Sequence, residues 1–284
     1  MITLAIQKSG RLSDKTKELL RESGIHFENG SRNPLKAKAV NFPLQILSLR
    51  DDDIPEFVAD GGADAGIVGQ NVCLEKEKDV RLLEKLGFAR CRLSVAVPNQ
   101  MPYHSIRDLA GLKIATSYPR ILRRFLEQNQ VQAEIHEVSG SVEIAPGIGF
   151  AQAIFDIVST GSTLMSNGLK EVVTVVDSEA VLIARPDLEA AKQRDLEQLL
   201  FRFRAVKKAR NYKYILLNAP NEAIEKIARI LPGMKSPTVM PLALPGWSSV
   251  HSVVEEDDFW EVIEGLRAEG AQGILVVPIE KMII

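Results

Sequence analysis

The residues best suited to chemistry form one short segment, in which an acidic residue precedes a turn of small hydroxylated residues. Asp156 begins an apolar strand pattern, Asp156–Ser159, and the turn Ser159-Thr160-Gly161-Ser162-Thr163 leads into a helical pattern from Leu164. Such a turn directs free backbone N–H groups to one point, where the helix dipole and hydroxyl donors add to them. Gly161 lets the backbone approach an anion because it carries no Cβ. The pattern indicates a phosphate-binding loop.

An ordinary helix capped by Ser or Thr would show the same loop, so the loop alone leaves both interpretations open. Two carboxylates, Asp156 and the upstream Glu143, favour the phosphate site. A carboxylate can accept hydrogen bonds from vicinal ribose hydroxyls while the loop holds the 5′-phosphate. No Gly-Lys-Ser/Thr follows as in a Walker A loop, and Gly147-Ile148-Gly149 lacks the strand and third glycine of a dinucleotide fingerprint.

A regular alternation of short apolar strands and amphipathic helices must position these candidates. The first block has strand patterns at Ile2–Ile6, Leu44–Leu49 and Ala65–Val68, and helical patterns at Ser13–Ser23, with Ser13 as cap, and from Asp51-Asp52-Asp53 to Val58. The second block has strand patterns at Leu93–Val97, Lys113–Thr116, Glu134–Val138 and Asp156–Ser159, and helical patterns at Ser105–Ala110 and Arg120–Gln128. This spacing predicts parallel α/β sheets in two lobes that face each other across a cleft.

The last part of the chain has a different order of elements, strand–helix–strand–strand–helix–strand, which is typical of a ferredoxin-like domain. The ranges are Tyr214–Leu217, Asn221–Leu231, Thr238–Leu242, Ser249–Val254, Asp257–Glu269 and Gly273–Val277. We expect the apolar run 172–184 to lead back to the first lobe and the helix Asp187–Arg210 to lead into the last domain. The predicted α/β protein therefore has lobe I at 1–90 with 172–208, lobe II at 91–171, and a ferredoxin-like domain at 209–284.

Composition and charge argue against several functional classes. The chain has 35 basic and 37 acidic residues, a net charge of −2, so no global field favours nucleic acid or an anionic membrane. The basic runs 120–124 and 202–210 are better explained as solvated helix faces. Cys73 and Cys91 form no CxxC pair, and the four histidines show no metal-ligand spacing. Because no signal-peptide pattern or membrane-span run is found, a cytoplasmic protein is expected.

Seven short motifs, taken in order, resemble the long form of the ATP phosphoribosyltransferase family over nearly the whole chain. They are Ala5-Ile6-Gln7-Lys8-Ser9-Gly10-Arg11-Leu12, Leu49-Arg50-Asp51-Asp52-Asp53-Ile54-Pro55, Gly62-Ala63-Asp64-Ala65-Gly66-Ile67-Val68-Gly69, Ile114-Ala115-Thr116-Ser117-Tyr118-Pro119, Gly140-Ser141-Val142-Glu143, the loop above, and Val276-Val277-Pro278-Ile279-Glu280-Lys281-Met282. The resemblance implies a two-lobed core like that of periplasmic binding proteins and an ACT-like last domain.

The resemblance also implies roles for individual residues. The residues expected to bind phosphoribosyl pyrophosphate are Glu143, Asp156, Ser159, Thr160, Gly161, Ser162 and Thr163. Lys8 and Arg11 would face the pyrophosphate or the ATP phosphates as catalytic residues, and Arg50, Asp64 and Tyr118 would bind ATP. Two alternatives stay open: Arg50 and Asp64 could form an ion pair that closes the lobe, and Tyr118 could be a packing residue.

The implied reaction is attack by N1 of the adenine of ATP on C1 of the ribose, with release of pyrophosphate, as the first step of histidine synthesis. Alignment and charge stabilisation would supply most of the rate, and Mg²⁺ would bridge pyrophosphate oxygens. The last domain would bind histidine as a feedback inhibitor, with Asn218, Thr238 and Gly273 as candidates, in a homo-hexamer that needs no separate synthetase-like subunit. The rival interpretations are a non-catalytic protein that binds a small anion and a purely regulatory amino-acid sensor.

Overall fold

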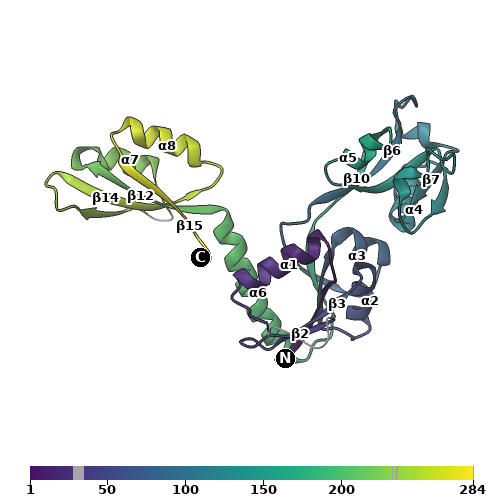
Figure 1. Cartoon of the computed structure of the whole chain (residues 1–284), viewed down its shortest axis with the longest axis horizontal. Helices are drawn as coiled ribbons and strands as arrows, with labels where there is room; N and C mark the ends of the chain where they lie inside the picture. The colour runs from purple at the N-terminus through teal and green to yellow at the C-terminus, as the bar shows by residue number, and fades with distance from the viewer. Residues whose placement is uncertain (28–34, 232, 234–235, 284) are drawn as a thin grey trace. The chain divides into compact units, whose positions relative to one another are not determined.

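The computed structural model describes residues 1–27, 35–231, 233 and 236–283. The chain divides into two compact units, residues 1–18 with 25–196 and residues 19–24 with 197–284. Figure 1 shows their elements, with two sheets in the first unit and one in the second. The expected fold class, an α/β core with two sheets followed by a separate small sheet domain, is confirmed.

The first sheet has six strands in the order β2-β3-β1-β4-β11-β5. The strands are β1 (Ile2–Gln7), β2 (Lys36–Lys38), β3 (Leu44–Leu49), β4 (Ala65–Gly69), β5 (Arg81–Lys85) and β11 (Ala180–Ala184). β1 is parallel to both β3 and β4, whereas β2, β5 and β11 run antiparallel to their neighbours. Every residue of β4 and β11 is buried, which is why these strands have continuous apolar sequences.

Short connections join the strands of the first sheet to its helices. They are α1 (Arg11–Glu22), the short 3-10 helix η1 (Asp51–Asp53), α2 (Ile54–Ala59) and α3 (Gln70–Lys76). The prediction that Ser13 caps α1 is wrong, because the helix begins at Arg11 and Ser13 lies inside it, fully buried. Gly10, with a φ of +98°, makes the turn, and its carbonyl accepts from the Asp14 N–H.

The second sheet has five strands in the order β10-β6-β9-β7-β8. Its elements are β6 (Cys91–Pro98), η2 (Ile106–Leu109), β7 (Lys113–Thr116), α4 (Pro119–Gln128), β8 (Glu134–Glu137), η3 (Val142–Ile144), β9 (Ala153–Val158), α5 (Ser162–Ser166) and β10 (Leu169–Ser178). The expected parallel pairing is present for β1 with β3 and β4 and for β7 with β8 and β9, but both sheets also contain antiparallel strands, here β6 with β9 and β10. β9 also begins at Ala153, so Asp156 is its fourth residue rather than its first.

The apolar run 172–184 contributes a strand to each of the two sheets. β10 stays in the second sheet through Ser178, and β11 joins the first sheet from Ala180. The return to the first sheet therefore happens around Glu179. The three-domain division given above remains a proposal.

The last sheet has four antiparallel strands in the order β13-β14-β12-β15, which is the ferredoxin-like arrangement. Its elements, after the helix α6 (Ala190–Arg210), are β12 (Tyr212–Pro220), η4 (Asn221–Ala223), α7 (Ile224–Ile230), β13 (Thr238–Pro241), β14 (Trp247–Glu255), α8 (Phe259–Ala268) and β15 (Gln272–Pro278). Both helices cover one face (Figure 1), where Ile215, Leu217 and Val250 meet Ile227 and Leu266 in one core. Within the described residues, no helix combines the length and apolar character that crossing a membrane requires.

Candidate functional site

The loop between β9 and α5 exposes its polar groups. Ser159, Thr160, Ser162 and Thr163 are all exposed. The N–H groups of Thr160, Gly161 and Thr163 meet no backbone acceptor among the described residues. Because α5 has only five residues, these amides and hydroxyls, rather than a long helix dipole, are the donors that an anion would meet.

Gly161 gives the loop its shape. Its φ is +81°, in the left-handed region, and an added Cβ would come within 4 Å only of Val158 Cγ1, at 4.0 Å. The space around the glycine is therefore open, and its backbone conformation is what requires glycine.

A small apolar cluster holds both ends of the loop and the segment that carries Glu143. Val142, Val158 and Leu164 are buried in this cluster. The expected ribose-binding carboxylates, Glu143 on η3 and Asp156 on β9, are thus fixed to the same core as the loop. Burial, together with the nearby Glu143 carboxylate, raises the pKa of Asp156 to about 6, although the Ile157 N–H donates to its carboxylate at 2.8 Å.

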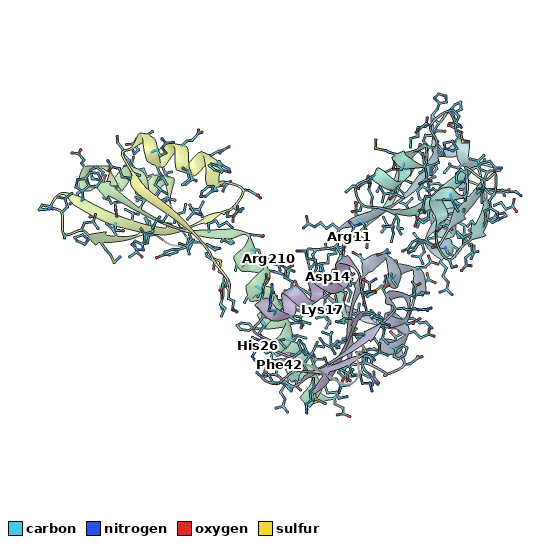
Figure 2. The ribbon with its side chains drawn as sticks, in the orientation of Figure 1. Arg11, Asp14, Lys17, His26, Phe42 and Arg210 are labelled. Carbon is cyan, nitrogen blue, oxygen red and sulfur yellow. The ribbon has the colours of Figure 1, made fainter. Side chains whose placement is uncertain are left out.

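The candidate cations lie on the first sheet. Lys8 directly follows β1, Arg50 directly follows β3, and Arg11 is the first residue of α1 (Figure 2). All three are exposed. Since β1 and β3 are parallel, Lys8 and Arg50 share the carboxyl-terminal edge of the sheet, the edge at which α/β sheets bind ligands.

Asp64 lies apart from these cations, at the opposite edge, because it precedes β4 instead of following it. It is 4% exposed, accepts from the Thr3 N–H at 2.8 Å and pairs with Lys192 Nζ at 2.9 Å. These contacts give Asp64 a structural role, so we do not include it in the nucleotide site. The ion pair between Arg50 and Asp64, offered as the alternative, is wrong, since the partner of Asp64 is Lys192.

Tyr118 lies in the turn before α4, and its hydroxyl accepts from Asn71 Nδ2 at 3.0 Å. Burial is the largest cause of a raised pKa of Tyr118, followed by the charge of Asp156 and then the charges of Asp51 and Asp52. Tyr118 therefore lies within electrostatic reach of Asp156 on β9 and of Asp51 and Asp52 on η1, and its hydroxyl remains protonated.

Sequence reasoning missed several polar residues around these candidates. Arg92 on β6 donates to the Ser159 backbone oxygen at 3.3 Å and is paired with Glu171 on β10. Asn71 and Glu75 follow β4 at the same sheet edge as Lys8, one helical turn apart. That position, directly after a buried parallel strand, is the signal that could have identified them. Among the described residues, no group of three or more His, Cys, Asp or Glu side chains is arranged to hold a metal ion.

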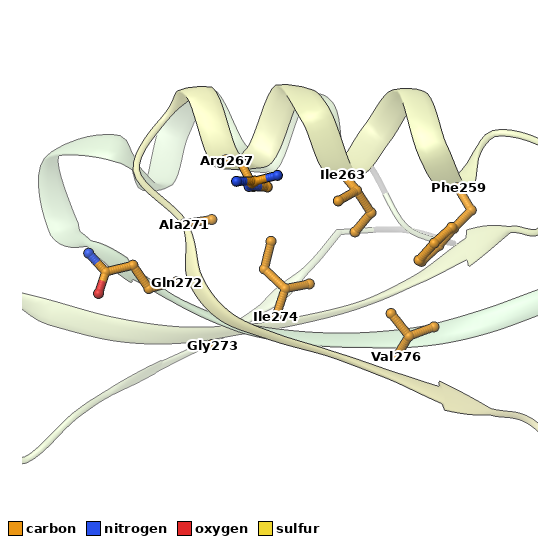
Figure 3. A pocket seen from close by; sticks show the side chains of 8 residues that line it. All are labelled: Phe259, Ile263, Arg267, Ala271, Gln272, Gly273, Ile274 and Val276. Atoms are coloured by element: carbon orange, nitrogen blue, oxygen red, sulfur yellow. The ribbon is translucent and has the colours of Figure 1, made fainter.

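In the last domain, two of the three expected regulatory residues are neighbours. A Cβ added to Gly273 would lie 3.6 Å from Asn218 Nδ2, whereas Thr238 is on β13, separated from β12 by β14. Gly273 also borders a groove of about 500 Å³ between α8 and β15, with apolar walls and the guanidinium of Arg267 (Figure 3). The structure thus brings Asn218 and Gly273 together and leaves Thr238 further along the sheet.

Comparisons with known proteins identify the same family over nearly the whole chain. The model of the family described as "ATP phosphoribosyltransferase" matches residues 50–205, and that of "HisG, C-terminal domain" matches residues 209–281. A protein of Cytophaga hutchinsonii named ATP phosphoribosyltransferase is 57% identical over 283 residues, covering 100% of this chain and 99% of its own. A protein of the same name from Bacteroides thetaiotaomicron is 55% identical over 284 residues, covering 100% of both chains.

Among solved structures, the ATP phosphoribosyl transferase (HisG:HisZ) complex from Thermotoga maritima is similar to this chain. The two are 26% identical with a TM-score of 0.63, and the match covers 72% of this chain and 96% of that chain.

Proposed function

The chain belongs to the ATP phosphoribosyltransferase family, a family of transferases in histidine biosynthesis, and on that premise we propose that it joins the phosphoribosyl group of phosphoribosyl pyrophosphate to N1 of ATP. The new bond forms between N1 of the adenine and C1 of the ribose. The bond from C1 to the pyrophosphate oxygen breaks, and pyrophosphate leaves with the electron pair.

The observation that carries this proposal is the exposed loop 159–163 beside two carboxylates. Amides and hydroxyls without backbone partners among the described residues suit the 5′-phosphate, and the ionised form of Asp156 with Glu143 suits the ribose hydroxyls. The Val142–Val158–Leu164 cluster supports this role because it holds the loop and both carboxylates on one rigid base.

Charge stabilisation falls to cations of the first sheet. Lys8 and Arg11 lie just after β1, where their charges would offset the negative charge that collects on pyrophosphate in the transition state. Arg50 would pair with the ATP phosphates, and the Tyr118 hydroxyl would donate to the nucleotide. No nucleophile from the protein is required, because N1 of the adenine attacks C1 and alignment of the two bound substrates supplies much of the rate.

Mg²⁺ fits the acidic pair near the loop. Carboxylate oxygens are ligands that Mg²⁺ prefers, and burial, followed by the charge of Glu143, raises the pKa of Asp156, so a cation would stabilise its ionised form. We propose that Asp156 and Glu143, the carboxylates beside the ribose, would hold the ion together with ribose hydroxyl oxygens and water. When bound, Mg²⁺ supplies positive charge that helps the pyrophosphate to leave.

The last domain is proposed to bind histidine and to inhibit the reaction. Asn218 and Gly273, which are neighbours, are the principal candidates, and Thr238 is a further one. We also propose a homo-hexamer that works without a second type of subunit. Inhibition requires histidine to bind two states of the enzyme with different affinity.

The test is an assay of the purified chain with ATP, phosphoribosyl pyrophosphate and Mg²⁺. Pyrophosphate release that depends on both substrates is the expected result, with inhibition on addition of histidine. Binding of phosphoribosyl pyrophosphate without turnover would favour the rival binding protein. Binding of histidine alone would favour the rival sensor, and either result would overturn the proposal.

A further inference from the structure

Asn71, on α3, is held in one orientation by a pair of hydrogen bonds to Ser178. Its N–H donates to Ser178 Oγ at 3.0 Å, and its Oδ1 accepts from that hydroxyl at 2.8 Å. Because Oδ1 is occupied in this way, Nδ2 is the atom directed at Tyr118. Asn71 is 4% exposed, so its geometry is fixed by buried contacts.

The residue before α3 confirms how closely this side chain is fitted. A Cβ added to Gly69 would lie 2.3 Å from Asn71 Oδ1, too close for any side chain. Glycine at 69 therefore makes room for the amide.

The hydrogen bond from Asn71 decides what the Tyr118 hydroxyl can do. Asn71 Nδ2 donates and the Tyr118 oxygen accepts, so the hydroxyl proton remains available to donate to another group. Burial and the nearby carboxylates raise the pKa of Tyr118, so this proton stays on the oxygen at neutral pH. The result is an oriented donor rather than an acceptor.

Glu75, one turn further along α3, holds the backbone that carries Tyr118. It is 8% exposed, and its two carboxylate oxygens accept from the N–H groups of Arg120 and Ile121, each at 3.0 Å. These N–H groups lie in the first turn of α4, where a helix has no internal acceptor for them. A carboxylate at this place also complements the positive end of the helix dipole.

Arg120 makes the reverse contact. Its Nη1 donates to the backbone oxygens of Glu75 at 3.4 Å and Lys76 at 3.2 Å, at the carboxyl end of α3. Each helix therefore caps the other, which joins α3, the helix after β4, to α4, the helix after β7. We call Asn71, Glu75, Tyr118, Arg120 and Ile121 the α3–α4 junction.

We infer that Asn71 and Glu75 are positioning residues that fix Tyr118 as a hydrogen-bond donor to the nucleotide. The inference rests on the proposed function, since it takes the nucleotide as the ligand of Tyr118. We expect the junction to act mainly on the nucleotide, because the loop 159–163 is held by a different core, the Val142–Val158–Leu164 cluster.

The first test compares Michaelis constants in Glu75→Ala, Asn71→Ala and Tyr118→Phe variants of the full chain. We expect the KM for ATP to rise about tenfold in each, the effect of losing one good hydrogen bond. The KM for phosphoribosyl pyrophosphate should change less than about twofold. Glu56→Gln is the matched control, because Glu56 lies on the neighbouring helix α2 and pairs with Lys78 on the surface.

A double-mutant cycle separates positioning from general stability. If Glu75 acts through Tyr118, adding Glu75→Ala to Tyr118→Phe should raise the KM for ATP little further. Additive effects, or an equal rise in both Michaelis constants, would overturn the inference. If Glu75→Ala fails to fold, Glu75→Gln replaces it in the test. Glu75→Gln keeps one acceptor oxygen, so its KM for ATP should rise less.

Hydrogen exchange gives a readout that does not need turnover. In the Glu75→Ala protein, the amides of Arg120 and Ile121 should exchange faster than in the wild type and in Glu56→Gln. Unchanged exchange would refute the junction itself. An inactive wild type with the expected exchange would instead refute the proposed function, so the two failures are distinguishable.

Discussion

Nη1 of Arg92 lies 3.3 Å from the backbone oxygen of Ser159, so a side chain of β6 holds the first residue of the candidate phosphate loop. The same guanidinium is paired with Glu171 on β10, which also accepts from Ser94 Oγ at 2.7 Å. This pairing is the main reason that the pKa of Glu171 is lowered to about 2. The charge of Arg92 is therefore largely balanced by Glu171. Its guanidinium supports the loop and is not the group that binds an anion.

Replacing Glu171 by Gln should weaken the binding of phosphoribosyl pyrophosphate, because Arg92 loses the partner that orients it towards Ser159. We expect the KM for phosphoribosyl pyrophosphate to rise about threefold to tenfold, with the KM for ATP nearly constant. The loss of stability should be about 1 kcal/mol or less, since the pair is partly solvated. Initial rates and thermal unfolding measure both. Glu134→Gln, on the exposed edge strand β8, is the control, and a similar rise there would count against the support.

The pH dependence of substrate binding should follow Asp156. Its pKa is raised to about 6, so the carboxylate gains a proton as the pH falls through that value. Because a protonated carboxyl is a poorer acceptor for ribose hydroxyls, the KM for phosphoribosyl pyrophosphate should rise below about pH 6. Rates measured from pH 5 to pH 8 test this. A KM that does not rise below pH 6 in the wild type, or a rise that persists in the Asp156→Asn protein, would exclude Asp156 as the cause.

The same shift predicts an effect on folding with a definite sign. The folded state keeps the proton of Asp156 at pH values where the unfolded chain, with a pKa near 3.8, has lost it. Stability therefore falls as the pH rises from about 4 to about 6, and the penalty is complete above that. Asp156→Asn should raise the free energy of unfolding at pH 7 by about 1–3 kcal/mol while weakening substrate binding. Denaturant unfolding at pH 4 and pH 7 compares the two proteins.

Substitution of Gly161 should damage the loop through its backbone. A φ of +81° costs an L-residue about 1 kcal/mol, whereas the space for a Cβ is open. Gly161→Ala is therefore expected to fold, to turn the amides from their direction and to lower affinity for phosphoribosyl pyrophosphate. Gly149, with a φ of +74° and nothing within 4 Å of an added Cβ, is the matched control. Normal affinity in Gly161→Ala by calorimetric titration would contradict the loop's role.

Local patterns predicted most elements but not their pairing. The strands at Leu44–Leu49 and Lys113–Thr116 match because short apolar runs bounded by turns are sufficient signals. The start of β9 was misplaced, since Ala153 to Phe155 could equally end a helix. The Ser13 prediction failed because burial of one face of α1 prevailed over a capping preference.

For the candidate site too, local features could be predicted from the sequence and long-range contacts could not. The loop 159–163 and its carboxylates lie close in sequence, so they could be recognised from it. The contacts of Asn71 and Glu75 could not, because their partners Tyr118 and Arg120 are 47 and 45 residues away along the chain. The ion pair of Asp64 could not be recognised for a related reason: its partner Lys192 is 128 residues distant.

Lys8 and Asp64 should respond to substitution in opposite ways, because one is exposed at the carboxyl edge of the first sheet and the other is buried at the amino edge. Lys8→Ala should lower kcat by about 10²-fold, since it removes charge that the transition state needs, and should leave thermal unfolding nearly unchanged. The Lys8 backbone keeps its place through the hydrogen bond to Leu49, at 2.8 Å. Asp64→Asn should instead lower stability by about 1–2 kcal/mol, because the partly exposed Lys192 loses its charged partner, and the folded fraction should retain normal kcat and KM. Steady-state rates and denaturant unfolding of both proteins test these expectations. Normal turnover in Lys8→Ala would show that Lys8 has no catalytic role. A raised KM for ATP in a stable Asp64→Asn protein would show that Asp64 belongs to the nucleotide site.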